Sequence, residues 1–274
     1  RKWPTRAQVQ YAVVWGSASP SEGRIVLDGR EVESISTLLE AGSEATDPVM
    51  LRSNANRAYL GAKISGAFIV DAATASSIMD ADPGSKPLLK QLVTGMSINS
   101  EPEHVSDDWV LDTDRCTEAE LERHSVLRTL LHGRSTGEGE WWRFPRPARA
   151  LRERLDQSDS VLAFAEVSQT IVPARISAAF LPNHKCAVIV TDSFAEQAVL
   201  SSTFHWLWVA RYASTQGVAP SYAPSQVYAT FPLPSETSKL TALGRQLDTH
   251  RAEILMRRQL GLTKLYHLVN DSEL

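Results

Sequence analysis

The chain has 274 residues, of which 43% are hydrophobic and 22% are charged, a composition typical of globular proteins. It contains no apolar run of about 18 residues and no charged-then-apolar leader, which argues against a membrane span and against secretion. Its two cysteines, Cys116 and Cys186, lack CxxC spacing, which argues against a disulfide framework and a cysteine-rich zinc site. We therefore expect a cytoplasmic protein with no membrane partner.

The net charge of −4 counts against nucleic-acid binding, which usually requires a basic surface. The charges are unevenly distributed, however. Acidic residues cluster between positions 101 and 122, and arginines dominate between positions 123 and 154. Such a patch can bind phosphate on an acidic protein, although a solvated arginine face is an equally open interpretation.

The first half of the sequence predicts short strands and helices. Residues 9–15 are rich in β-branched and aromatic side chains and predict a strand, and residues 24–27 followed by Asp28-Gly29 predict a hairpin. Weak helical spacing covers residues 32–39. Residues 58–70 predict a strand with a bulge, residues 71–80 a helix capped by Asp71, and residues 87–93 a second helix.

The second half predicts alternating strands and helices. Residues 109–111 predict a strand, and residues 117–132 predict a helix with a capping box of Thr117 and Glu120. The remaining predictions, in chain order, are a helix over 148–155, strands over 160–167, 171–180 and 186–191, a helix over 194–212, an irregular connector over 217–234, and helices over 235–260 and 262–269. Aromatic spacing in residues 204–212 indicates that most of its aromatic side chains belong to the core.

Together these elements predict an α+β fold with a mixed or antiparallel sheet and flanking helices. The change in composition near Phe231-Pro232-Leu233-Pro234 places a boundary there. We expect an α+β domain over residues 1–234 and a small helical segment over residues 235–274. Because the sequence begins at Arg1 without Met, we expect it to be a fragment of a longer protein.

Motifs for known chemistry are absent from the sequence. It contains no GxSxG, HExxH, P-loop or GxGxxG motif, and no Asn/Asp-Pro-Pro-aromatic loop of the kind that amino-methyltransferases use. Asp192 and His205 with Ser193 or Ser201 could form a hydrolytic triad, but structural roles are the more economical interpretation. We expect no catalytic residue, metal or cofactor in this chain.

Several segments, in the same order, resemble the target recognition domain and C-terminal helical region of MmeI-like (type IIL/IIG) restriction–modification enzymes and related adenine-specific DNA methyltransferases. Residues 55–68 resemble the opening "ANRG-K-S-F", residues 141–147 resemble "WWQFxRPRP", and residues 222–234 resemble "YTPTDCFETFPFP". Further matches lie at residues 82–102, 109–112, 164–192, 200–212 and 261–271. Two departures are Glu101 and Gln169, where the family has arginine and lysine.

The resemblance implies that the chain recognises double-stranded DNA for a methyltransferase domain of the same parent chain. That absent domain would flip an adenine and methylate it with S-adenosylmethionine, while this part reads base edges in the major groove. For base reading we predict Glu166, Ser168 and Thr170, because residues two apart on a strand share a face, and Arg175, because a guanidinium can form a bidentate contact with guanine. The alternative is that they are solvent-facing strand positions.

For phosphate contact we predict Arg143, Arg146, Arg149 and Lys185, of which the first two lie in a proline-stiffened segment. Carboxylate pairing within the fold is the open alternative for the arginines. The acidic net charge also leaves open a different function, a protein-docking module of a phage-defence methyltransferase complex with weak DNA contact.

Overall fold

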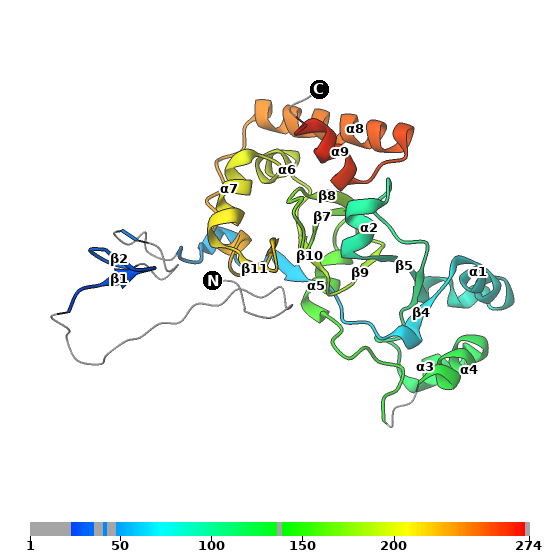
Figure 1. The fold of residues 1–274 in the computed structure, drawn as a ribbon. Helices are drawn as coiled ribbons and strands as arrows, with labels where there is room; N and C mark the ends of the chain where they lie inside the picture. The colour runs from blue at the N-terminus through cyan, green and yellow to red at the C-terminus, as the bar shows by residue number, and fades with distance from the viewer. Residues whose placement is uncertain (1–22, 36–40, 43–47, 136–138, 272–274) are drawn as a thin grey trace. The chain divides into compact units, whose positions relative to one another are not determined.

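The computed structural model describes residues 23–35, 41–42, 48–135 and 139–271 (Figure 1). Contacts divide the chain into two compact units, residues 1–49 and residues 50–274. The first unit contains the predicted hairpin, in which β1 (Val26–Leu27) and β2 (Arg30–Glu31) pair around Asp28 and Gly29, both with positive φ. The strand predicted at residues 9–15 and part of the helix predicted at residues 32–39 lie outside the described residues.

The second unit contains two four-stranded sheets. The central sheet is antiparallel, with the spatial order β3 (Ala58–Leu60), β10 (Cys186–Ile189), β7 (Ser160–Ala165) and β8 (Ala174–Ser177). The lateral sheet has the order β4 (Ile69–Val70), β6 (Trp109–Leu111), β5 (Leu89–Val93) and β9 (Leu181–Pro182), and its β5–β9 pair is parallel. The fold is therefore α+β with antiparallel and mixed sheets, as predicted.

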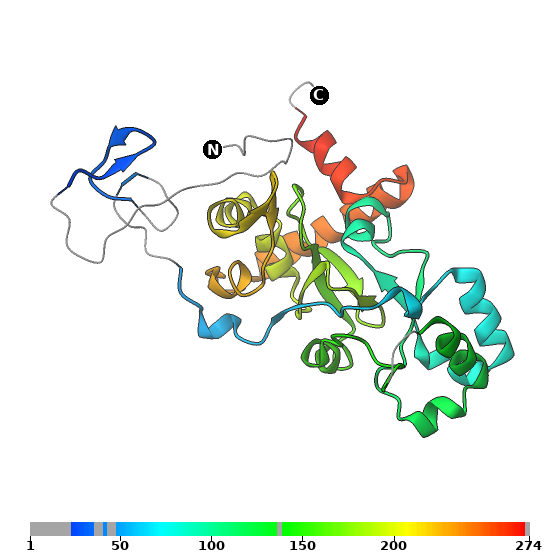
Figure 2. The ribbon, with the colours of Figure 1, turned by 60° about the horizontal axis from the view of Figure 1, so that its bottom comes forward.

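The central sheet is covered on both faces. All residues of β10 are buried, with Val188 in one hydrophobic cluster and Ala187 in another. Helix α5 (Arg149–Leu155) packs on one face, as Figure 2 shows, and α7 (Thr203–Tyr212) contributes to the cluster on the other. Burial on both faces explains why these strands read as continuous apolar runs.

The lateral sheet is associated with the helices of the middle third of the chain. They are α1 (Ala72–Ala81), α3 (Glu118–Glu122) and α4 (Ser125–Arg134), with the 3-10 turns η2 (Gly66–Phe68) and η3 (Pro83–Leu88). The two predicted caps are present: Asp71 accepts a hydrogen bond from Thr74 N, and Thr117 and Glu120 form a capping box. Such bonds satisfy backbone donors that the first helical turn leaves free.

Four predicted elements are divided or changed. Residues 58–70 form β3 and β4, which belong to different sheets, and residues 117–132 and 194–212 each form two helices. In the latter case α6 (Phe194–Leu200) ends before Ser202, whose side chain caps α7. The helix predicted at residues 87–93 is largely strand β5, because pairing with β6 and β9 overrides its weak local preference.

The C-terminal part contains α8 (Ser238–Arg258) and α9 (Leu262–Val269), as predicted. Before it, the predicted connector contains β12 (Ala219–Ser221), paired with β11 (Ser214–Gln216), and the turn η4 (Tyr228–Thr230). In Figure 1, α8 lies along α6 and α9 lies near α2 (Gly95–Ser100). The domain boundary at residue 234 stays a prediction.

Gly244 permits the close packing of α8 on α6. A Cβ atom at this position would lie 1.8 Å from the carbonyl oxygen of Phe194, a main-chain atom that cannot rotate away as a side chain could.

We expect Gly244→Ala to lower the free energy of unfolding by about 1–3 kcal/mol through overpacking, measured by urea denaturation. Gly133→Ala in α4 is the matched control, since nothing lies within 4 Å of its Cβ position. Gly133→Ala should be neutral or stabilising by up to about 1 kcal/mol. Equal losses of unfolding free energy in both variants would contradict the packing role of Gly244.

Candidate nucleic-acid interface

The segment predicted to read bases is a loop rather than a strand. Strand β7 ends at Ala165 and β8 begins at Ala174, so residues 166–173 connect them outside the ladder. Beyond Ala165 the chain turns toward β12, where Val167 forms a bridge with Ser221. The expectation that residues two apart share a strand face is therefore wrong for Glu166, Ser168 and Thr170.

The three loop residues differ in their availability to a ligand. Ser168 is only 8% exposed, and its hydroxyl accepts hydrogen bonds from Thr170 N and Asn99 Nδ2, each at 2.9 Å. Glu166 is partly exposed and forms an ion pair with Lys185 at 3.1 Å. Thr170 is also partly exposed. Ser168 is thus a structural residue of the loop, and Glu166 and Thr170 stay candidates for base contact.

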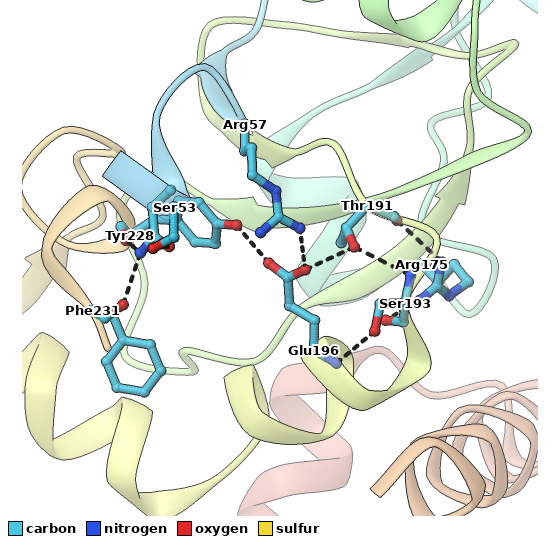
Figure 3. Close-up of polar contacts among 9 residues, drawn as sticks. Ser53, Arg57, Arg175, Thr191, Ser193, Glu196, Tyr228 and Phe231 are labelled. Carbon is cyan, nitrogen blue, oxygen red and sulfur yellow. Dashed lines mark hydrogen bonds and ion pairs between the residues drawn. The ribbon is translucent and has the colours of Figure 1, made fainter. Parts of the chain in front are cut away.

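Arg175 is used within the fold, as Figure 3 shows, which favours a structural role over the predicted contact with guanine. Its Nε donates to Gln197 Oε1 at 2.9 Å, Nη1 donates to Ser160 Oγ at 3.0 Å, and Nη2 donates to Ser193 O at 3.2 Å. The guanidinium also lies 4.4 Å from the ring centre of Phe194. Because all three nitrogens donate internally, Arg175 has a structural role, and its contact with a base stays a prediction.

A buried carboxylate lies next to this arginine (Figure 3). Glu196, whose side chain is 4% exposed, accepts hydrogen bonds from Arg57 at 2.5 Å, Thr191 Oγ1 at 2.8 Å and Tyr228 OH at 2.6 Å. Burial raises the pKa of Tyr228, and the adjacent Glu196 charge raises it further, so the phenol stays protonated as a donor. The network connects three distant segments, and sequence reasoning missed it because its members show no local pattern.

The predicted phosphate-binding arginines have different environments. Arg143 forms an ion pair with Glu140 at 2.8 Å and donates to Asp114 O at 2.9 Å, which is the internal pairing left open above. Arg149 is exposed at the start of α5. Arg146 is exposed, and its backbone oxygen accepts from Lys63 N at 2.8 Å. Arg146 and Arg149 thus stay candidates.

Three cations from separate segments lie near one another and near His184. The backbone brings them together, because Lys63 pairs with Arg146 and His184 N donates to Ala62 O at 2.8 Å. The pKa of His184 is lowered by burial first and then by Lys185, with smaller lowering effects of Arg146 and Lys63, while the Glu166 carboxylate raises it. We call Lys63, Arg146 and Lys185 the basic edge. It unites two predicted phosphate contacts, Arg146 and Lys185, with Lys63, which the sequence did not indicate as a contact.

Gly61 makes this arrangement possible. A Cβ atom there would lie 2.1 Å from the carbonyl oxygen of Asn183 in the turn between β9 and β10. The turn is held in place by Asn183 Oδ1, which accepts from Lys185 N at 2.9 Å. Only glycine lets the two backbones approach so closely, and this approach places Lys63 beside the turn that carries Lys185.

The triad considered above does not assemble. His205 is buried, and its Nε2 lies 3.0 Å from Tyr222 OH, while Ser193 Oγ caps α6 by accepting from Glu196 N. In the part of the chain that the structure describes, no three His, Cys, Asp or Glu side chains are grouped to hold a metal ion. Within the same residues, no helix combines the length and apolarity needed to cross a membrane.

The structural role of Arg175 can be tested by its effect on stability. We expect Arg175→Met to lower the free energy of unfolding by about 2–4 kcal/mol, because it leaves acceptors such as Gln197 Oε1 and Ser193 O unsatisfied. Arg149→Met, at an exposed position, should change it by less than about 0.5 kcal/mol. Both are measured by urea denaturation. An unchanged stability of Arg175→Met, together with an altered DNA sequence preference, would restore the base-reading assignment.

Comparison with known proteins identifies a structural neighbour. No protein-family model matches the sequence, and no curated protein matches it. Among solved structures, the chain is similar to the type IIL restriction–modification enzyme MmeI in complex with DNA, with a TM-score of 0.61 and 18% sequence identity. The similarity covers 86% of this chain and 33% of the MmeI chain, so the chain spans about a third of that enzyme. At this identity the likeness establishes a shared fold.

Proposed function

We propose that this chain is the double-stranded DNA recognition module of a site-specific adenine methyltransferase or restriction–modification enzyme. The observation that carries the proposal is the basic edge, which lies on a fold shared with a protein solved in complex with DNA. The order of sequence motifs described above supports the same assignment. Methylation would require a separate methyltransferase domain with S-adenosylmethionine, which acts where this chain directs it.

The basic edge and the adjacent loop suit two parts of DNA recognition. Lys63, Arg146 and Lys185 offer cationic donors to phosphates, which fix orientation without reading sequence. Glu166 lies beside Lys185 and presents a carboxylate, the group that accepts a hydrogen bond from cytosine N4. Backbone contact and base reading would therefore occur side by side.

The phosphate contacts can be tested by salt titration of duplex binding. We expect affinity to fall steeply with salt, and each of Lys63→Ala, Arg146→Ala and Lys185→Ala to reduce the slope of log K against log salt by about 0.9, the value for one phosphate contact. The measurement is fluorescence anisotropy with a labelled duplex across a salt series. Arg154→Ala, at an exposed position in α5, is the control and should leave the slope unchanged. Unchanged slopes in all three variants would reject the basic edge as a phosphate site.

The role of Glu166 is tested separately, through sequence preference. Glu166→Gln replaces an acceptor by a group that also donates, so we expect it to change the preferred base at one position, with a discrimination of about 1–3 kcal/mol. Competition among randomised duplexes, read by sequencing the bound fraction, measures this preference. Glu153→Gln, exposed on α5, should leave it unaltered. A uniform loss of affinity across sequences would instead assign Glu166 to the positioning of Lys185.

A second candidate function is a protein-docking module, and exposed apolar side chains on α7 favour it. Phe204 and Leu207 are 80% and 53% exposed and lie three residues apart, hence on one helix face. Trp206 is exposed as well, so the expectation of a core role is wrong for Phe204 and Trp206. Capture of a protein partner that is independent of salt and lost in Phe204→Ser would favour docking over DNA recognition.

A further inference from the structure

A hollow of about 480 Å³ lies along the outer edge of strand β3. Three segments form it: residues 50–61, residues 146–148 before α5, and residues 224–229. Its lining includes Ala55, Asn56, Tyr59, Arg146 and Ser225. Its volume falls in the range of about 300–1,000 Å³ that is usual for small-molecule sites.

The strand edge offers hydrogen-bonding groups to this hollow. Strand β3 is the last strand of the central sheet, and its Tyr59 is paired with Val188 of β10. Because N–H and C=O groups alternate in direction along a strand, those of Ala58 and Leu60 face away from β10. Within the described residues, these groups make no hydrogen bond. Each residue therefore presents a donor beside an acceptor.

The walls add an aromatic ring and a cation. Tyr59 OH donates to Asn56 O at 2.7 Å, which fixes the ring, and Asn56 itself is held in the left-handed region with φ 55°. Arg146, a member of the basic edge, lines the hollow, and the exposed Ser225 contributes a hydroxyl. The small side chain of Ala55 leaves the space open.

We propose that the hollow binds a single nucleotide, with the base edge against β3 and the phosphate at Arg146. A nucleobase carries a donor and an acceptor side by side on its pairing edge, which matches the N–H and C=O of Ala58 or Leu60. The base presents a flat face to Tyr59, and such stacking is tolerant of base identity. Addition of a peptide strand fits less well, because β3 has three residues and ends at Gly61, which is pressed against Asn183.

The nucleotide could come from either of two sources. One is a base displaced from a bound duplex, in which case the inference rests on the proposed function. The other is a free mononucleotide, which would bind whether or not the chain reads DNA. The chemistry is the same, so the experiment needs one arm for each source.

The test uses the 274-residue chain and a variant that fills the hollow. Ser225→Trp places a large ring in the hollow from an exposed position, and Ser225→Ala removes the hydroxyl without filling it. In the first arm, calorimetry measures binding of dAMP, dCMP, dGMP and dTMP. In the second arm, duplexes with 2-aminopurine at successive positions report an unstacked base by increased fluorescence. Circular dichroism checks that both variants are folded.

We expect Ser225→Trp to weaken mononucleotide binding at least about tenfold, as loss of one stacked base does, and to abolish the 2-aminopurine signal. Ser225→Ala should retain both. Amide hydrogen exchange of the unaltered chain gives an independent readout, because a bound nucleotide should slow exchange at Ala58 and Leu60. This readout holds even if Ser225→Trp fails to fold.

The outcomes separate this inference from the proposed function. Salt-dependent duplex binding without mononucleotide binding, 2-aminopurine signal or slowed exchange would overturn the nucleotide site and leave DNA recognition intact. Mononucleotide binding without duplex binding would support the site and reject DNA recognition. Protection of Ala58 and Leu60 by extended peptides but not by nucleotides would overturn the proposal in favour of strand addition.

Discussion

The buried carboxylate of Glu196 holds the second unit in one arrangement. A charge inside a protein is costly unless it is paired and hydrogen-bonded, and here Arg57, Thr191 and Tyr228 meet this requirement. These donors lie just before β3, just after β10 and in the turn η4. Displacement of any one segment would remove a hydrogen-bond donor from the buried carboxylate, so the three segments are fixed together.

Both proposed sites depend on this connection through β3. Asn54, just before the strand, donates to the backbone oxygens of Tyr228 and Phe231, each at 2.8 Å, and so ties the strand entrance to the loop that forms the far wall of the hollow. At the other end, Gly61 brings the strand against the turn that carries Lys185. The hollow and the basic edge thus both adjoin β3, whose two ends are fixed by these contacts.

Local features were predictable from the sequence, and long-range ones were not. The caps at Asp71 and Thr117 depend on residues three positions away, so the sequence contains the whole interaction. The division of residues 58–70 between two sheets depends on partners more than 40 positions away, such as Val188 and Val110. Arg146 and Arg175 look alike in the sequence; only tertiary contacts show that Arg175 donates internally while Arg146 lines a hollow.

The charge asymmetry that suggested a DNA-binding arginine patch has another explanation in the structure. Arginines from the basic stretch pair with nearby carboxylates: Arg152 contacts Asp112 and Asp114 of the preceding acidic stretch, and Arg143 contacts Glu140. Burial raises the pKa of Asp112 even though Arg152 opposes this effect. The Arg152–Asp112 ion pair therefore offsets the cost of burying the carboxylate within the fold, and this arginine does not serve a ligand. The cations of the basic edge come instead from three separated segments, two of them outside that stretch. The proximity of these cations is therefore a property of the fold, because backbone pairing brings together residues that are far apart in the sequence.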